Sequence, residues 1–325
     1  MITLQQIEDA ATRLAGVSVR TPLLRSADLD NAAGGEVLVK PECLQVTGSF
    51  KIRGAYNFLS QLGEEEAQRG VVAFSSGNHA QGVAAAGSML GIRTAIIMPE
   101  DAPRAKLENT RRLGGEVITY DRYTGDRETI ARELAAQRGS VVVPSYDHDY
   151  IIAGQGTVGL EIAEQCAELG TKPDQTLVCC GGGGLIAGSA TALKARFPDA
   201  AVHPVEPEHF DDTARSLRSG KREQCDASAR SICDALQAQT PGKLTFAINR
   251  QLLDTGLVVS DTEVRDAMRF AFASLKIVVE PGGAVALAAA LAGKVDTRDK
   301  TTIVVLSGGN VDSDLFASIQ RKASG

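Results

Sequence analysis

The chain has 325 residues, of which 43% are hydrophobic and 23% charged, and its formal net charge at pH 7 is −6. This length can bury a large core in two domains or one large α/β unit, and the absence of a long apolar run excludes an integral membrane protein. Lys and Arg are scattered rather than gathered into a stripe, which argues against a nucleic-acid surface and favours a small-molecule partner.

The N-terminal segment and the cysteines indicate the compartment. Residues 1–9 lack the basic and apolar stretches of a signal peptide, so we expect a cytoplasmic protein. The six cysteines show no C-x-x-C spacing, and they are typical of small buried side chains in a reducing compartment rather than of disulfides or a zinc site.

Short β-branched runs alternate along the chain with Ala-rich amphipathic stretches, which predicts parallel sheets with helical crossovers. The predicted strands are residues 36–40, 71–75, 94–98, 116–120, 140–143, 176–180, 201–205, 256–259 and 301–306. The predicted helices are residues 78–90, 103–113, 125–137, 154–169, 185–197, 262–275 and 284–292. The least patterned stretch, residues 219–243, indicates irregular structure near a site or an interface.

The first candidate loop, TGSFKIRGA at residues 47–55, carries Lys51 beside Phe50 at the start of a helix. A lysine in this position is often a surface residue whose aliphatic stem lies along apolar neighbours. The alternative is a nucleophilic amine whose pKa is lowered by burial, so that it can form an imine with the aldehyde of a cofactor.

The second loop, SSGNHAQG at residues 75–82, follows an apolar strand and opens a helix. Small side chains and free N–H groups at a helix N-terminus suit an anion such as a substrate carboxylate. An ordinary helix cap would explain Ser76 or Asn78, although not the whole cluster. His79 taken alone is more typical of a packed helix residue than of a base.

The third loop contains the four consecutive glycines Gly181, Gly182, Gly183 and Gly184 between a strand and a helix. Glycine runs are entropically costly, and here they favour backbone N–H groups closing around a phosphate over a bare sharp turn. The run fits neither a Walker A loop nor G-x-G-x-x-G. A fourth loop, SGGN at residues 307–310, follows the last strand, where the Ser307 hydroxyl could meet a ring nitrogen or the loop could be a plain strand exit.

In this order and spacing, the four loops resemble those of the fold-type II pyridoxal-phosphate (PLP) enzymes, in the branch of the serine/threonine dehydratases and serine racemases. The resemblance covers nearly the whole chain. It implies that Lys51 carries the cofactor, that Phe50 packs on the ring, that Asn78 bonds the ring hydroxyl, and that Ser307 faces the pyridine nitrogen. It also implies that the four glycines hold the phosphate.

The resemblance further implies the domains and the assembly. We expect two doubly wound α/β domains with parallel sheets and the cofactor in the cleft between them. The large PLP-binding domain comprises residues 1–67 and 146–325, and the small substrate-side domain comprises residues 68–145. A homodimer is the family expectation.

Further segments resemble substrate and metal sites of the family. The substrate residues are expected to be Ser75, Ser76, Asn78, His79 and Arg127. Arg127 lies in the segment GDRE at residues 125–128, where Glu128 could join a proton network; an ordinary charged first helical turn is the alternative.

The run VEPEHFDD at residues 205–212 resembles the metal loop of the family. There Glu206, Asp212 and the carbonyl of Phe210 would supply oxygen ligands for Mg²⁺ or Ca²⁺. Without the resemblance, the run would be a solvated acidic turn. One departure affects the substrate: Ala235 stands where relatives commonly have a glycine close to the bound amino acid.

These features predict a PLP-dependent ammonia-lyase, a dehydratase of L-threonine or L-serine that eliminates the β-hydroxyl and forms a 2-oxo acid and ammonia. Lys51 would remove the Cα proton, and Ser76, as a second catalytic residue, would allow racemisation if it lies on the opposite face. The alternatives are a 3-hydroxyaspartate dehydratase in which Arg127 binds the additional carboxylate, a serine racemase, and, from another class, a non-catalytic nucleotide-binding protein.

Overall fold

A computed structural model describes residues 2–102, 104–121 and 123–321. The strands are β1 (Leu24–Arg25), β2 (Glu36–Pro41), β3 (Val71–Phe74), β4 (Thr94–Pro99), β5 (Glu116–Tyr120), β6 (Val141–Val142), β7 (Gln175–Cys179), β8 (Ala201–Pro207), β9 (Leu257–Val259) and β10 (Thr301–Leu306). The first α-helices are α1 (Leu4–Leu14), α2 (Ala27–Ala33), α3 (Lys51–Leu59), α4 (Glu64–Arg69), α5 (Asn78–Leu90), α6 (Arg104–Arg112) and α7 (Arg127–Arg138). They are followed by α8 (Asp149–Glu168), α9 (Gly184–Arg196), α10 (Asp212–Ser219), α11 (Lys243–Leu252), α12 (Asp261–Phe270), α13 (Pro281–Leu291) and α14 (Ser313–Gln320). Four shorter helical segments are η1 (Glu42–Leu44), η2 (Val46–Gly48), η3 (Asp234–Leu236) and the π-helix η4 (Ala271–Leu275).

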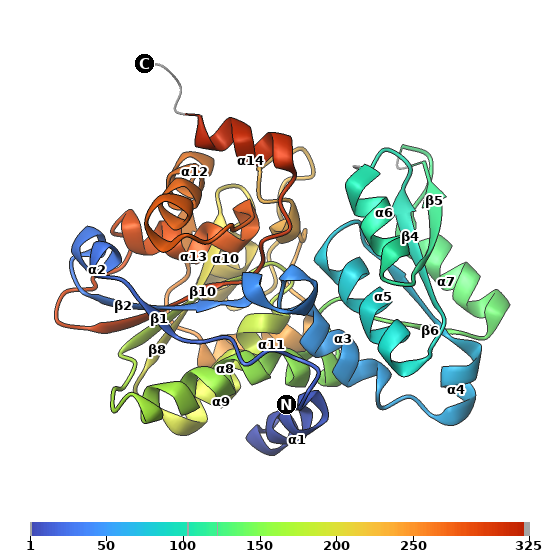
Figure 1. The fold of residues 1–325 in the computed structure, drawn as a ribbon, viewed down its shortest axis with the longest axis horizontal. Coiled ribbons are helices and arrows are strands. Elements are labelled where there is room, and N and C mark those ends of the chain that lie inside the picture. Colours follow the sequence, from blue (N-terminus) through green and yellow to red (C-terminus); the bar gives the residue numbers. More distant parts are fainter. Residues whose placement is uncertain (1, 103, 122, 322–325) are drawn as a thin grey trace.

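The strands form two sheets. The first has the order β1-β2-β10-β7-β8-β9 and is parallel except for β1, and the second has the order β5-β4-β3-β6 and is parallel throughout. In Figure 1 the elements of the second sheet lie to the right of the first sheet, with α3 at the junction. The predicted α/β class with parallel sheets is confirmed, and the carboxyl ends of the parallel strands are the edges where ligands of such sheets bind.

Most predicted elements lie where the periodicity put them, and the differences are at the ends. Helix α7 begins at Arg127 rather than residue 125, because the carboxylate of Asp126 accepts hydrogen bonds from the N–H groups of Glu128 and Thr129 and caps the helix there. The predicted start of the helix at residue 103 lies outside the described residues, and α6 is described from Arg104.

Helix α8 starts at Asp149, five residues before its predicted start, and glycines let it approach its neighbours closely. A Cβ at Gly154 would stand 2.5 Å from the carbonyl oxygen of Arg53, and a Cβ at Gly156 would stand 2.9 Å from that of Gly188. Helix α8 therefore packs tightly against α3 and α9. This contact fixes the helix whose first residue is Lys51.

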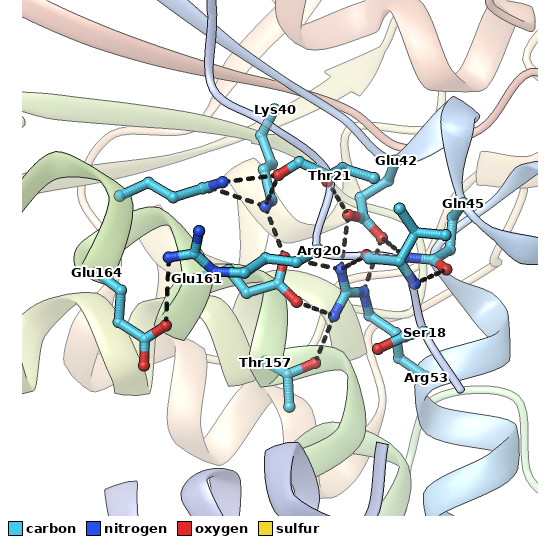
Figure 2. A network of polar contacts seen from close by, with 12 residues as sticks. Ser18, Arg20, Thr21, Lys40, Glu42, Gln45, Arg53, Thr157, Glu161 and Glu164 are labelled. Atoms are coloured by element: carbon cyan, nitrogen blue, oxygen red, sulfur yellow. Dashed lines mark hydrogen bonds and ion pairs between the residues drawn. The ribbon is translucent and has the colours of Figure 1, made fainter. Parts of the chain in front are cut away.

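A buried ionic network lies under α3 (Figure 2). Arg53 donates to Glu42 from Nε (2.8 Å) and to Glu161 from Nη1 (2.7 Å), and Lys40 donates from Nζ to the second oxygen of Glu161 (2.6 Å). The side chains of Lys40, Glu42 and Arg53 are fully buried. Two cations and two carboxylates balance, so the network joins β2, η1, α3 and α8 without a net buried charge.

The partition of the strands into two sheets supports the proposed domain division at residues 68 and 146, because β3, β4, β5 and β6 all fall between these boundaries. The division itself stays a proposal, and residues 1 and 322–325 of the large domain lie outside the described part of the chain. No helix among the described residues combines the length and the apolar character that crossing a bilayer requires.

Candidate active site

Lys51 is the first residue of α3 and lies at the carboxyl edge of the first sheet. Its Nζ donates to the carbonyl of Ser145 (2.8 Å) and stands 5.2 Å from the centre of the Phe50 ring. Burial lowers the pKa of Lys51 to about 8, with the nearby thiol of Cys179 acting in the opposite direction. A substantial part of the amine is therefore neutral near pH 8 and able to act as a nucleophile.

The four glycines follow β7 and lead into α9. Gly183 has φ +90°, a left-handed conformation that favours glycine, and a Cβ there would stand 2.7 Å from Nδ2 of Asn249. Within the described part of the chain, the N–H groups of Gly181, Gly182 and Gly183 donate to no protein acceptor. Together with the N-terminus of α9, they have the geometry that suits a phosphate, as the sequence predicts.

Three side chains that were not predicted from the sequence border the glycine loop. The ring of Tyr146 lies against Gly182, and Oγ1 of Thr245 donates to the carbonyl of Gly182 (2.7 Å). Both polar atoms of the buried Asn249 side chain lack a hydrogen-bond partner among the described residues. An unpaired amide beside Gly183 is a further donor suited to an anion.

The loop after β3 carries Ser75, Ser76, Asn78 and His79 at the edge of the second sheet. Oγ of Ser75 accepts from the N–H of Gly77 (3.2 Å). His79 is buried and its Nε2 donates to the carbonyl of Val143 (3.2 Å). Burial and, to a smaller extent, the charge of Lys51 lower the pKa of His79 to about 3, so the ring is neutral and only Nδ1 remains for a substrate.

The last loop follows β10, between the strands that precede the lysine and glycine loops. Ser307 is buried, and its carbonyl accepts from the N–H of Phe50 (3.2 Å). Burial raises the pKa of the neighbouring Cys179 thiol to about 11, against a hydrogen bond from Ser307 and the charge of Lys51. The structure thus brings the hydroxyl, the thiol and the amine together.

Asn78 lies at the start of α5 and is held by two partners that come from the first-sheet side. Its Oδ1 accepts from Nδ2 of Asn310 (2.7 Å), and its Nδ2 donates to Oε1 of Glu280 (2.5 Å). Nδ2 of Asn310 also donates to the carbonyl of Thr47 (2.8 Å). A Cβ at Gly308 would collide with the carboxylate of Glu280, so the SGG sequence makes room for this buried acid.

A cavity of about 270 Å³ opens beside the loop after β3. It is lined by Ser76, Pro99, Tyr120, Gly125, Asp126 and Arg127. The guanidinium of Arg127 lies 6.0 Å from the centre of the Phe74 ring and makes no ion pair with a described residue. Glu128 instead pairs with Arg132 one turn along α7. Ser76 and Arg127, two of the predicted substrate residues, therefore share one cavity, whereas Glu128 is absent from its lining.

The predicted metal ligands lie together at the end of β8 and the start of α10. The carboxylate of the buried Glu206 accepts from the N–H groups of Thr213 (2.9 Å) and Ala214 (2.7 Å). Burial and the charge of Asp212 raise the pKa of Glu206 well above its usual range, and burial raises the pKa of Asp212 to about 6. Oδ2 of Asp212 is buried without a partner among the described residues.

Two adjacent buried carboxylates with an unsatisfied oxygen favour a bound cation. The carbonyl of Phe210 would be the third ligand. Of the described residues, no three His, Cys, Asp or Glu side chains form a group that could hold a metal by themselves.

The segment of residues 219–243 is irregular, as its composition indicates. Its first residue ends α10, its last residue opens α11, and between them lies only the short η3. The carbonyl oxygen of Ala235 lies 3.6 Å from a Cβ placed on Gly181, so the residue that departs from the expected glycine borders the glycine loop. The neighbouring Asp234 pairs with Lys106 of α6 (2.7 Å), which connects this segment to the second-sheet side.

These residues fit pyridoxal phosphate. Lys51 supplies a partly neutral amine, the glycine loop supplies free N–H groups for the phosphate, and the Ser307 hydroxyl lies in the same region. Comparison with known proteins agrees: the family model described as "Pyridoxal-phosphate dependent enzyme" matches residues 15–309.

Two curated relatives and one solved structure are similar over nearly their whole length. The chain is 45% identical to the L-threo-3-hydroxyaspartate ammonia-lyase of Pseudomonas sp, covering 95% of this chain and 96% of the relative. It is 42% identical to the serine racemase of Schizosaccharomyces pombe, covering 97% and 96%. The structure of maize serine racemase superposes with a TM-score of 0.91 at 38% identity, covering 98% and 96%.

Proposed function

Because the chain belongs to the pyridoxal-phosphate dependent enzyme family, with PLP as its cofactor, we propose that it acts as an ammonia-lyase that prefers 3-hydroxyaspartate. The predicted family and cofactor are confirmed, and the relatives are ammonia-lyases and racemases. In the proposed reaction the substrate loses the Cα proton and the β-hydroxyl, and hydrolysis of the resulting enamine releases ammonia and a 2-oxo acid. When bound, PLP stabilises the electron pair left at Cα.

The chain's own residues would bind the substrate and move its protons. The Lys51 amine, once free, accepts the Cα proton at Nζ, and its lowered pKa suits a base working near neutrality. Free N–H groups at the start of α5 suit the α-carboxylate. Arg127 suits a second carboxylate, since its guanidinium forms charge-assisted hydrogen bonds with such a group.

The observation that carries the substrate proposal is that Arg127, which has no ion-pair partner among the described residues, lines the cavity that also contains Ser76. Serine and threonine have no second carboxylate to offer it. The name of the Pseudomonas relative supports the same choice.

The substrate test compares kcat/KM for L-threo-3-hydroxyaspartate, L-serine and L-threonine. We expect Arg127→Met to lower the value for hydroxyaspartate about 100-fold, corresponding to the loss of a charge-assisted pair worth about 2–3 kcal/mol, and to change the value for serine less than about threefold. Arg132→Met is the matched control, because Arg132 is on the same helix and pairs with Glu128 instead. A wild-type protein that prefers serine or threonine would contradict the choice of hydroxyaspartate and return the function to a serine/threonine dehydratase.

The cofactor test is the visible absorption of the purified protein. We expect a yellow band that borohydride bleaches. Lys51→Ala should lack this band and Lys276→Ala should keep it, because Lys276 is exposed and donates to the carbonyl of Ala273. A colourless wild-type protein would instead favour the non-catalytic nucleotide-binding alternative.

Serine racemase is a second candidate, supported by the Schizosaccharomyces pombe and maize relatives and by the hydroxyl of Ser76 beside the cavity. Formation of D-serine that disappears in Ser76→Ala would support it.

We also propose a structural Mg²⁺ or Ca²⁺ at Glu206, Asp212 and the Phe210 carbonyl. The cytoplasmic location and the homodimer remain predictions.

A further inference from the structure

A chain of hydrogen bonds with a fixed direction leads to Asn78. It starts at the carbonyl of Thr47, runs through the amides of Asn310 and Asn78, and ends at the carboxylate of Glu280. The Thr47 carbonyl can only accept a hydrogen bond. It therefore determines the orientation of both amides, Asn310 and Asn78, that lie between it and Glu280.

The donor and acceptor roles follow one from another. Asn310 must turn its Nδ2 toward the Thr47 carbonyl, and the same nitrogen reaches Asn78, so Asn78 must present Oδ1 to it. Nδ2 of Asn78 then faces Glu280 and needs an acceptor there, which a carboxylate supplies. One N–H of Asn78 is used in this way, and its second N–H donates to no described residue.

Glu280 is itself held in place by the backbone. It is the cap residue before α13, its N–H donates to the carbonyl of Gly308 (3.0 Å), and only 4% of it is exposed. Pro281, the first residue of the helix, and the absence of a side chain at Gly308 leave the carboxylate directed at Asn78. Burying a carboxyl group costs free energy unless it is hydrogen-bonded, and Asn78 supplies a hydrogen bond to Glu280.

We propose that Glu280 is a positioning residue that, together with the Thr47 carbonyl, directs the second N–H of Asn78 at the ring oxygen of the bound cofactor. This inference rests on the proposed function and on the role that the family resemblance implies for Asn78, a hydrogen bond to that oxygen. An N–H fixed in this way favours an oxygen that accepts, and hence the deprotonated form of the ring hydroxyl.

The charge on Glu280 changes near neutral pH. Burial raises the pKa of Glu280 to about 7, and the charge of Asp234 acts in the same direction, whereas the hydrogen bond from Asn78 and the charge of Lys106 lower it. The thiols of Cys43 and Cys179 also face it, and both remain protonated because burial raises their pKa values to about 12 and about 11. As the pH rises through 7, Glu280 becomes a stronger acceptor and Asn78 a stronger donor.

The test measures how apoenzyme discriminates between two probes, PLP and 3-deoxypyridoxal 5′-phosphate, which lacks the ring oxygen. Dissociation constants come from titration of the visible band at pH 8. We expect wild type to prefer PLP about tenfold or more, as expected for one hydrogen bond to a charged group. In Glu280→Met, which keeps the length of the side chain without an acceptor, we expect the ratio to fall to about threefold or less. Glu280→Gln is the matched control, because its amide can still present an oxygen to Asn78, and it should keep a ratio well above that of Glu280→Met.

An equal ratio in Glu280→Met and wild type would overturn the inference. If Glu280→Met does not fold, as judged by circular dichroism, the pH dependence of the ratio of the two dissociation constants decides. This ratio should rise between pH 6 and pH 8.5 in wild type and stay flat in Glu280→Gln. Parallel curves for the two proteins would overturn the inference. A wild-type protein without a Lys51-dependent band contradicts the proposed function instead, so the two failures are distinguishable.

Discussion

Removing the charge of Arg53 should destabilise the protein strongly, because it breaks the buried network under α3. In Arg53→Met, Lys40 is the one fully buried cation of the described residues left near the carboxylates of Glu42 and Glu161, and of these two it donates only to Glu161. Breaking a buried pair by removing one partner costs about 3–5 kcal/mol. For a chain of 325 residues, with an unfolding entropy of about 2.1 cal/mol/K per residue, that corresponds to a fall in Tm of about 4–7 °C.

The pH dependence of the stability of Arg53→Met gives a second expectation. Burial by itself would raise the pKa of Glu42, but in wild type the charge and hydrogen bonds of Arg53 outweigh it and the pKa is lowered. Without Arg53 the folded-state pKa of Glu42 should rise above its unfolded value. Stability then falls as the pH rises through that pKa, so the deficit of Arg53→Met should be larger at pH 8 than at pH 5.5.

The assay is thermal unfolding of the holoenzyme and of the apoenzyme at both pH values, with Arg53→Lys as the control that keeps a charge but loses the forked geometry. We expect Arg53→Lys to lose less stability than Arg53→Met. An Arg53→Met protein within about 1 kcal/mol of wild type at pH 8, or one whose deficit grows as the pH falls, would show that the network does not stabilise α3 in the way described.

Three further predictions concern the site. Gly183→Ala should weaken PLP binding by apoenzyme about tenfold in a spectral titration, because φ +90° strains an L side chain and the new Cβ meets Asn249. Gly181→Ala is the control and should have a smaller effect, because the atom nearest to its Cβ is 3.4 Å away. Equal effects of the two substitutions would contradict this prediction. The rate at which apoenzyme takes up PLP should rise with pH, reach half its maximum near pH 8 and level off above about pH 9, because burial lowers the pKa of the Lys51 amine to about 8; a rate still rising at pH 10 would be inconsistent with that value. Millimolar Mg²⁺ or Ca²⁺ should raise the Tm of wild type but not that of Asp212→Asn, since a ligand that binds only the folded state stabilises it by mass action; equal shifts in both proteins would place the cation elsewhere.

The local parts of the fold and site were predictable. Alternating β-branched and Ala-rich runs placed nine of the strands to within one or two residues at each end, and the glycine tetrad is visible because its residues are adjacent in the chain. The two-residue β1 carries no periodicity, and it was missed. The predicted start of helix α8 is too late, because His148 caps the first turn by accepting a hydrogen bond from the N–H of Tyr150. Histidine is not a typical helix cap, so no signal in the sequence marks that start.

Long-range partners were not predictable. Glu280 reaches Asn78 across 202 positions, and Ser145 reaches Lys51 across 94, so no spacing in the sequence connects them. An isolated Glu before Pro281 is an ordinary helix start, and an isolated Asn249 on an amphipathic helix is an ordinary polar residue. Only the fold shows that each of them is buried and directed at the site.

The position of Arg127 on the side of the second sheet has a consequence for how such a protein can change. Lys51, the glycine tetrad and Ser307 follow strands of the first sheet, while the walls of the Arg127 cavity come from the loop after β3, the last residues of β4 and β5, and residues 125–127. On the proposed function, exchanging these segments as a block should alter which substrate is selected and leave Lys51 and the glycine tetrad in place. Substrate choice would then be separable from the residues proposed to hold the amine and the phosphate.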